Sequence, residues 1–101
     1  MTWRVVATPR PPAAGAEFEV VRTSEAWSAL FEGAEATLSP EVSFDQEMAI
    51  HLPGELVVVA VTLSDESLVV ECRRDSSRSG GQAVVVPSVS LPIRIVLRED
   101  S

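Results

Sequence analysis

The amino-acid sequence predicts a mainly β fold of the β-rich α+β class. We expect about seven antiparallel strands, arranged as a sandwich or as a curled, partly closed sheet. Three observations support this prediction. Short runs rich in valine, isoleucine and leucine recur along the chain, and turn-forming residues separate them. Neighbouring runs follow one another without helical crossovers, which favours antiparallel pairing. One short segment, at about residues 24–32, changes to the helical period.

Length and composition indicate a single domain over residues 1–101. A chain of 101 residues has a common domain size, and its 46% of apolar residues suffices for a core without disulfides. We interpret residues 1–16 as a first strand followed by a proline-rich connection. Residues 17–98 form the predicted core, which opens with a second strand over residues 17–22.

The predicted helix carries a bulky apolar stripe. Three residues recur at the spacing i, i+3 and i+4: Trp27, Leu30 and Phe31. Thr23 or Ser24 is the expected N-cap, and Gly33 supplies a left-handed end. Because a helix this short is marginal by itself, we expect its apolar stripe to pack on the sheet.

Residues 42–63 predict a β-hairpin. The first strand, residues 42–52, alternates between apolar and polar side chains. Pro53 and Gly54 fit positions i+1 and i+2 of a tight turn. The second strand, residues 56–63, is apolar on both sides, which is typical of a strand inside a sheet.

The remaining strands are expected at residues 67–73, 82–87 and 91–98, with a polar loop over residues 74–82. In the last strand, four side chains are predicted to face the core: Leu91, Ile93, Ile95 and Leu97. Arg94 and Arg98 then face outward. Cys72, the single cysteine, excludes an internal disulfide, and its position in the strand pattern places it in the core.

Charge and hydropathy exclude several classes of partner. The net charge is −7, the isoelectric point is near 4.5, and all eight basic residues are arginines. This balance argues against binding to nucleic acid or to anionic membranes. No apolar stretch approaches the ~20 residues of a membrane span, and the first residues do not form a signal peptide. We therefore expect a cytoplasmic protein.

Three polar residues are the candidate site: Asp45, Glu47 and His51 share one side of the predicted strand. At ~3.3 Å per residue, Asp45 and Glu47 lie ~6.6 Å apart and Glu47 and His51 ~13 Å apart, too far for one metal ion. We interpret this polar face as solvated, with a carboxylate opposite Arg94 or Arg98 on a neighbouring strand. Replacement of His51 is then expected to change little, and we expect no metal and no cofactor.

The sequence favours a non-catalytic role. It contains one histidine, no lysine, no tyrosine and no Gly-x-Ser-x-Gly motif. We expect a protein–protein interaction or complex-stabilising module with a protein partner, or a homo-oligomer that pairs strand edges. The alternative is a small ligand-binding protein or hydrolase that uses the face of Asp45, Glu47 and His51 together with a second strand.

The helix and the strand after it carry a family pattern: Glu25, Trp27, Leu30, Val42, Phe44, Asp45, Met48 and Gly54. Together with the proline-containing strand at residues 92–96, residues 19–98 resemble the C-terminal domain of PrcB-type protease-complex subunits. The family's Gly-Gly-aromatic turn is absent, because Glu55 follows Pro53-Gly54 directly, and Phe44-Asp45 reverses the usual order of acid and aromatic residue. The resemblance implies a non-catalytic module that assists or stabilises a protein complex, such as a protease complex. It carries over no ligand residues.

Overall fold

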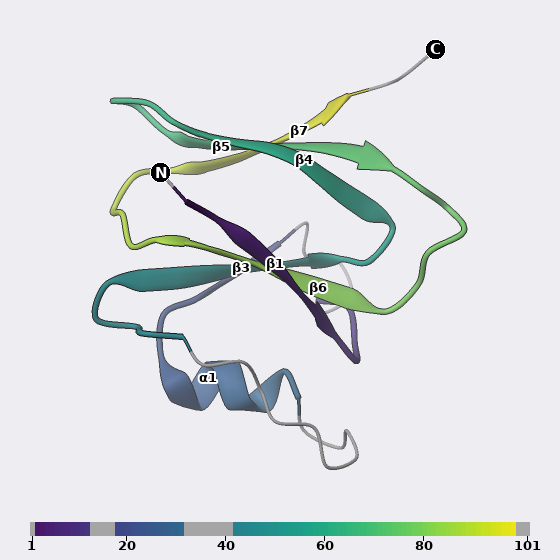
Figure 1. Cartoon of the computed structure of the whole chain (residues 1–101), viewed down its shortest axis with the longest axis horizontal. Helices are drawn as coiled ribbons and strands as arrows, with labels where there is room; N and C mark the ends of the chain where they lie inside the picture. Colours follow the sequence, from purple (N-terminus) through teal and green to yellow (C-terminus); the bar gives the residue numbers. More distant parts are fainter. Residues whose placement is uncertain (1, 13–17, 32–41, 99–101) are drawn as a thin grey trace.

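The computed structural model describes residues 2–12, 18–31 and 42–98, in which seven strands and one helix are present (Figure 1). In chain order they are β1 (Arg4–Thr8), β2 (Glu19–Val21), α1 (Ser24–Ala29), β3 (Glu47–Pro53), β4 (Leu56–Leu63), β5 (Leu68–Arg74), β6 (Gly81–Pro87) and β7 (Ile93–Arg98). The four-stranded sheet has the order β1-β6-β3-β2 and is antiparallel throughout. The three-stranded sheet has the order β4-β5-β7 and is mixed. The predicted mainly β class with one short helix is confirmed.

The two sheets pack face to face around the main core. β3 and β6 contribute Met48, Ile50, Leu52, Val84 and Val86, and β5 contributes Leu68, Val70 and Cys72. All of these side chains are almost fully buried. Figure 1 shows the three-stranded sheet above, the four-stranded sheet in the middle and α1 below. Of the two predicted architectures, the sandwich is therefore the one observed, and neither sheet closes on itself in the described part of the chain.

Helix α1 covers the other face of the four-stranded sheet. Thr23, one of the two expected caps, caps it, since its hydroxyl accepts a hydrogen bond of 3.2 Å from the Ala26 amide. Trp27 is buried against the small side chains of the sheet, Ala49, Ala83 and Val85. Their small size leaves room for the indole ring. The helix ends at Ala29, earlier than predicted. The predicted stop at Gly33 lies outside the described residues.

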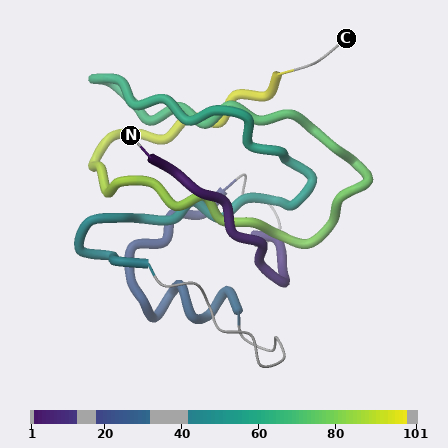
Figure 2. Tube along the Cα trace, in the orientation of Figure 1, coloured from purple at the N-terminus to yellow at the C-terminus, as the bar shows by residue number. Residues whose placement is uncertain are grey.

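The predicted hairpin over residues 42–63 is wrong. β3 and β4 do not pair but belong to different sheets, so the chain crosses from one layer to the other at Pro53–Leu56 (Figure 2). This β-arch lets Leu52 and Leu56 face the same core from opposite layers. Gly54 also serves a purpose other than the one predicted. Its φ is not positive, but a Cβ there would overlap the Ser79 carbonyl oxygen, so glycine is needed for close approach.

The strand predicted to begin at Val42 begins at Glu47. Residues 43–46 form a turn, in which the Gln46 and Glu47 amides donate to the Ser43 carbonyl at 2.9 and 2.7 Å. The turn places Phe44 beside Trp27, with ring centroids 6.1 Å apart in an edge-to-face arrangement. Alternation alone suggested a strand here because the turn happens to direct Val42 and Phe44 toward the cluster under α1.

One strand pair departs from the antiparallel expectation. β5 and β7 are parallel, because β6 lies in the other sheet and itself forms the crossover between them. β4, expected inside a sheet, lies at an edge. In β7, Ile93 and Ile95 pack on the core as predicted, but Leu97 is 46% exposed. Leu97 lies at the open end of the sandwich, where it lines a surface hollow.

Burial of Cys72 makes stability sensitive to alkaline pH. Cys72 is fully buried, as predicted, and burial raises the pKa of its thiol from 9.0 to about 11. Between these pH values the unfolded chain loses the proton and the folded chain keeps it. The free energy of unfolding is therefore expected to be unaffected by this group below pH 9 and to fall as the pH rises toward 11.

Urea unfolding between pH 8 and 11 checks this expectation. The sequence has no lysine or tyrosine, so Cys72 is the side chain that titrates in this window. A Cys72→Ala variant should lose the alkaline fall in stability. An identical fall in the variant would contradict the assignment.

Candidate functional site

The structure separates the three residues of the predicted polar face. Asp45 is exposed and lies in the turn before β3, not on the strand. Glu47 begins β3, and His51 lies four residues further along it. The three side chains therefore do not form one site. In the described part of the chain, no group of three or more His, Cys, Asp and Glu side chains is placed to hold a metal ion.

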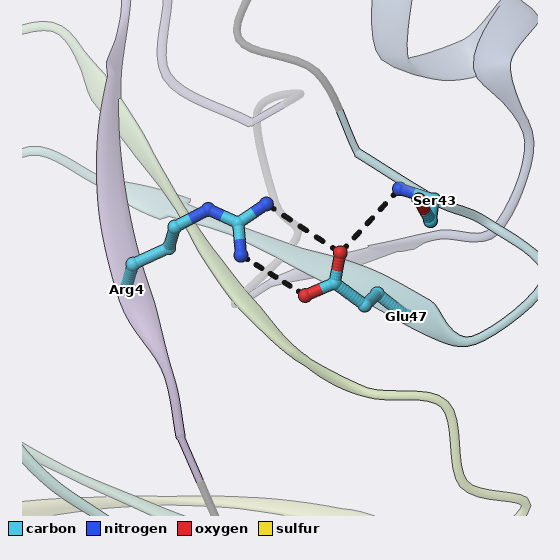
Figure 3. Close-up of polar contacts among 3 residues, drawn as sticks. All are labelled: Arg4, Ser43 and Glu47. Atoms are coloured by element: carbon cyan, nitrogen blue, oxygen red, sulfur yellow. Dashed lines mark hydrogen bonds and ion pairs between the residues drawn. The ribbon is translucent and has the colours of Figure 1, made fainter.

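Glu47 forms an ion pair with Arg4 of β1 (Figure 3). The Arg4 Nη1 and the Glu47 Oε2 are 2.9 Å apart, and Arg4 Nη2 donates to Oε1 at 3.5 Å. The Ser43 amide also donates to Oε1, at 3.4 Å. The hydrogen bond from Arg4 lowers the pKa of the Glu47 carboxyl. The expected pairing with Arg94 or Arg98 is wrong, because both arginines lie in the other sheet.

His51 is buried, not solvated. It is only 3% exposed. Its Nε2 lies 2.9 Å from the Arg10 carbonyl oxygen and 3.1 Å from the Thr8 hydroxyl. Because a carbonyl oxygen only accepts, Nε2 must carry the proton and donate to Arg10. The other ring nitrogen, Nδ1, has no hydrogen-bond partner in the described part of the chain.

The hydrogen bonds of His51 fix the chain after β1. The Thr8 hydroxyl donates to the Arg10 carbonyl at 3.0 Å, and the Arg10 guanidinium donates to the Ala29 carbonyl at the end of α1 at 2.9 Å. The cluster of Thr8, Arg10 and His51 packs against Gly81, where a Cβ would overlap the Arg10 carbonyl oxygen. The cluster thus joins β1, β3 and the helix end, which is a structural role.

His51→Ala is therefore expected to be destabilising, contrary to the expectation from sequence. The loss should be about 2 kcal/mol, because the Arg10 carbonyl loses one donor and a cavity remains. Chemical denaturation of the variant measures it, with Asp45→Ala in the exposed turn as the control. Equal stability of His51→Ala and Asp45→Ala would contradict this expectation and support a solvated His51.

A small hollow lies beside His51. Its volume is about 250 Å³, and it is lined by Arg10, Pro11, Pro12, Glu19, Leu30 and His51 among others. Glu19 stands opposite His51 in the strand register. This volume is below the range usual for small-molecule sites, and the Arg10 guanidinium is already bonded to the helix end.

The outer face of the three-stranded sheet is the largest feature that sequence reasoning missed. Alternation turns the following residues away from the core: Val57, Val59, Ala60 and Thr62 of β4, Val69, Glu71 and Arg73 of β5, and Arg94, Val96 and Arg98 of β7. We refer to these residues as the arginine–valine face. No described element covers it, since the four-stranded sheet and α1 both lie on the opposite side (Figure 1).

This face combines exposed valines with arginines. Val59 and Val96 are 41% and 37% exposed, and Arg73, Arg94 and Arg98 are exposed. Arg73 and Arg98 are neighbours in the parallel register. No side-chain hydrogen bond or ion pair joins Arg94 or Arg98 to another residue of the described chain. Three of the eight arginines of an acidic chain thus gather on one sheet face.

The sequence did indicate that Arg94 and Arg98 face outward. It gave no signal that Arg73 lies beside Arg98, because this register depends on the parallel pairing of two strands that β6 separates in the chain.

No helix in residues 2–12, 18–31 and 42–98 is long and apolar enough to span a membrane. Comparison of the chain with protein-family models, curated proteins and solved structures gives no match.

Proposed function

We propose that the protein is a non-catalytic interaction module that binds an acidic protein partner through the arginine–valine face. One observation carries this proposal: an uncovered sheet face displays arginines together with exposed valines on a chain whose net charge is −7. On β7, Val96 lies between Arg94 and Arg98 on this face, and arginine is enriched at protein interfaces.

The arginines favour carboxylates on the partner. Guanidinium groups bind carboxylates through two parallel hydrogen bonds, and these charge-assisted bonds are about twice as strong as neutral ones. On this face, three positive charges accompany the single negative charge of Glu71. An acidic surface therefore complements the face, although the chain as a whole repels acidic molecules at long range.

A second copy bound face to face is a poor match. A twofold interface places the same patch of both copies together. The three arginines of each copy would then share one interface with the three of the other, and only one Glu71 per copy would offset them. A partner of different and acidic composition avoids this repulsion.

Nucleic acid is also disfavoured as the occupant. The face has no aromatic side chain on which a base could stack, and the carboxylate of Glu71 on its central strand would repel a phosphate. The partner role agrees with the complex-stabilising module implied by the resemblance of residues 19–98 to PrcB-type C-terminal domains.

Charge reversal of the two arginines without partners tests the proposal. The protein is used to capture a partner from cells of its source, and the dissociation constant of the purified pair is measured by calorimetry. Arg94→Glu/Arg98→Glu should weaken binding at least about tenfold, equivalent to ~1.4 kcal/mol. A control, Arg22→Glu/Arg78→Glu, makes the same change in net charge away from the face and should retain affinity within about threefold.

The captured protein should have an acidic binding surface, and its affinity should fall with added salt. Equal losses in the two variants would mean that net charge, not the face, controls binding. Equally tight binding of a single-stranded oligonucleotide to the face would replace the proposal with nucleic-acid recognition.

A further inference from the structure

The outer edge of β7 is a free strand edge. β7 pairs with β5 on one side, and no other described strand pairs with it on the other. The Leu68 amide donates to the Pro92 carbonyl at 2.9 Å, and backbone groups alternate in direction along a strand. Residues 94, 96 and 98 therefore turn their backbone groups toward β5. Ile93, Ile95 and Leu97 turn theirs toward the open edge.

The other strand edges are less suited to receive a further strand. β4 is interrupted by a bulge between Val58 and Ala60, and bulged edges resist pairing. β2 has only three residues. β1 has five residues, one fewer than β7. β7 has six residues in unbroken register with β5.

The two sides of β7 differ in chemistry. On the outer side it presents Arg94, Val96 and Arg98, which belong to the arginine–valine face. On the inner side it presents Ile93, Ile95 and the 46% exposed Leu97. Beside the inner side lies a hollow of about 230 Å³, lined by Pro53, Glu55, Leu56, Arg74, Ile95 and Leu97.

We propose that the acidic partner contributes an extended segment that adds to the edge of β7, with acidic and apolar side chains in alternation. Its acidic residues meet Arg94 and Arg98 on the outer side. Its apolar residues lie along Ile93, Ile95 and Leu97 on the inner side, and one of them fills the hollow beside Leu97. Successive side chains of a strand point to opposite faces, so one period-2 segment satisfies both sides. This inference rests on the proposed function and specifies the partner's sequence pattern.

The arginines also exclude the simplest competitor, a second copy of β7. In an antiparallel pair of two β7 edges, Arg94 of one copy would face Arg98 of the other or lie near it, and like charges opposite each other destabilise a pair. Pairing of two β7 edges is therefore disfavoured, whereas pairing of β7 with an acidic strand is favoured.

Synthetic peptides test the pattern. A fluorescently labelled peptide of about eight residues, alternating glutamate and leucine, is compared by anisotropy with a control of the same composition in two blocks. The alternating peptide should bind at least about tenfold more tightly. Leu97→Asp should weaken it by a similar factor, because Leu97 borders the hollow, whereas Leu63→Asp, a matched change of an exposed leucine on β4, should not.

N-methylation of the peptide identifies strand addition. Methylation removes amide donors, and only alternate amides of an added strand face β7. Methylating the leucine positions should abolish binding if the segment is antiparallel to β7, and methylating the glutamate positions should abolish it if the segment is parallel. In either case the other methylated peptide keeps its affinity. Equal effects of the two methylation patterns would overturn strand addition.

The two proposals fail in distinguishable ways. If the captured partner depends on Arg94 and Arg98 but alternating and block peptides bind equally, the face is used without strand addition. If the partner is insensitive to Arg94 and Arg98, the proposed function itself fails.

Discussion

Trp27→Ala is expected to lower the free energy of unfolding by about 3–5 kcal/mol, the usual cost of truncating a buried tryptophan. Trp27 is 3% exposed and is the main contact of α1 with the sheet. It also makes edge-to-face contacts with Phe31 and Phe44 at 5.1 and 6.1 Å, which add to the effect of burial. Since small domains are stable by about 5–15 kcal/mol, much of the stability depends on this residue.

Denaturant unfolding followed by circular dichroism measures the Trp27 effect. Val5→Ala is a suitable control, because Val5 is 42% exposed at the edge strand β1 and should cost well under 1 kcal/mol. A loss below about 1 kcal/mol for Trp27→Ala would show that the helix does not dock through this side chain.

Gln82→Leu should cost about 3 kcal/mol, the second largest effect we expect. Gln82 is 2% exposed in the core between the sheets. Its Nε2 donates to the Pro53 carbonyl at 2.9 Å and to the Leu56 carbonyl. These two carbonyls lie on either side of the arch between β3 and β4. Leucine preserves the approximate volume but leaves both acceptors without this donor, at ~1–3 kcal/mol each.

The matched control for Gln82 is Gln46→Leu, the same change at an exposed turn position. Thermal or urea unfolding should separate the two variants clearly. Hydrogen exchange adds a local readout, since loss of the Gln82 bonds should increase exchange around residues 53–56. Equal stabilities would falsify the role of Gln82 in holding the arch.

Local features of this fold were predictable from sequence, and sheet membership was not. The Thr23 cap, the burial of Trp27 and the burial of Cys72 follow from spacing within one element. The arch at Pro53-Gly54 does not, because the same proline–glycine pair suits a tight turn within one sheet. The arch is bonded by Gln82, which is distant in the chain and whose side chain donates to the backbone on both sides of the arch.

The candidate site was misjudged for a related reason. His51 shares a strand face with Glu47, and alternation cannot tell whether that face is solvated. It is covered at the His51 end by the chain after β1 and by α1, while Glu47 remains part-exposed beside Arg4. The arginine–valine face likewise arises from a parallel pairing that no local pattern encodes.

The pairing of β1 with β6 has a consequence for the order of folding. It joins residues 4–8 to residues 81–85, whereas β4 and β5 are linked by a short turn in which Ser64 and Ser67 bond to each other. The β4–β5 hairpin can therefore form while the chain is still being made. At about 5–20 residues per second of synthesis, β1 must wait roughly 4–16 s for its partner to be made. Throughout that interval its valines lack the sheet that will receive them, so the nascent chain is most exposed to aggregation at its N-terminal strand.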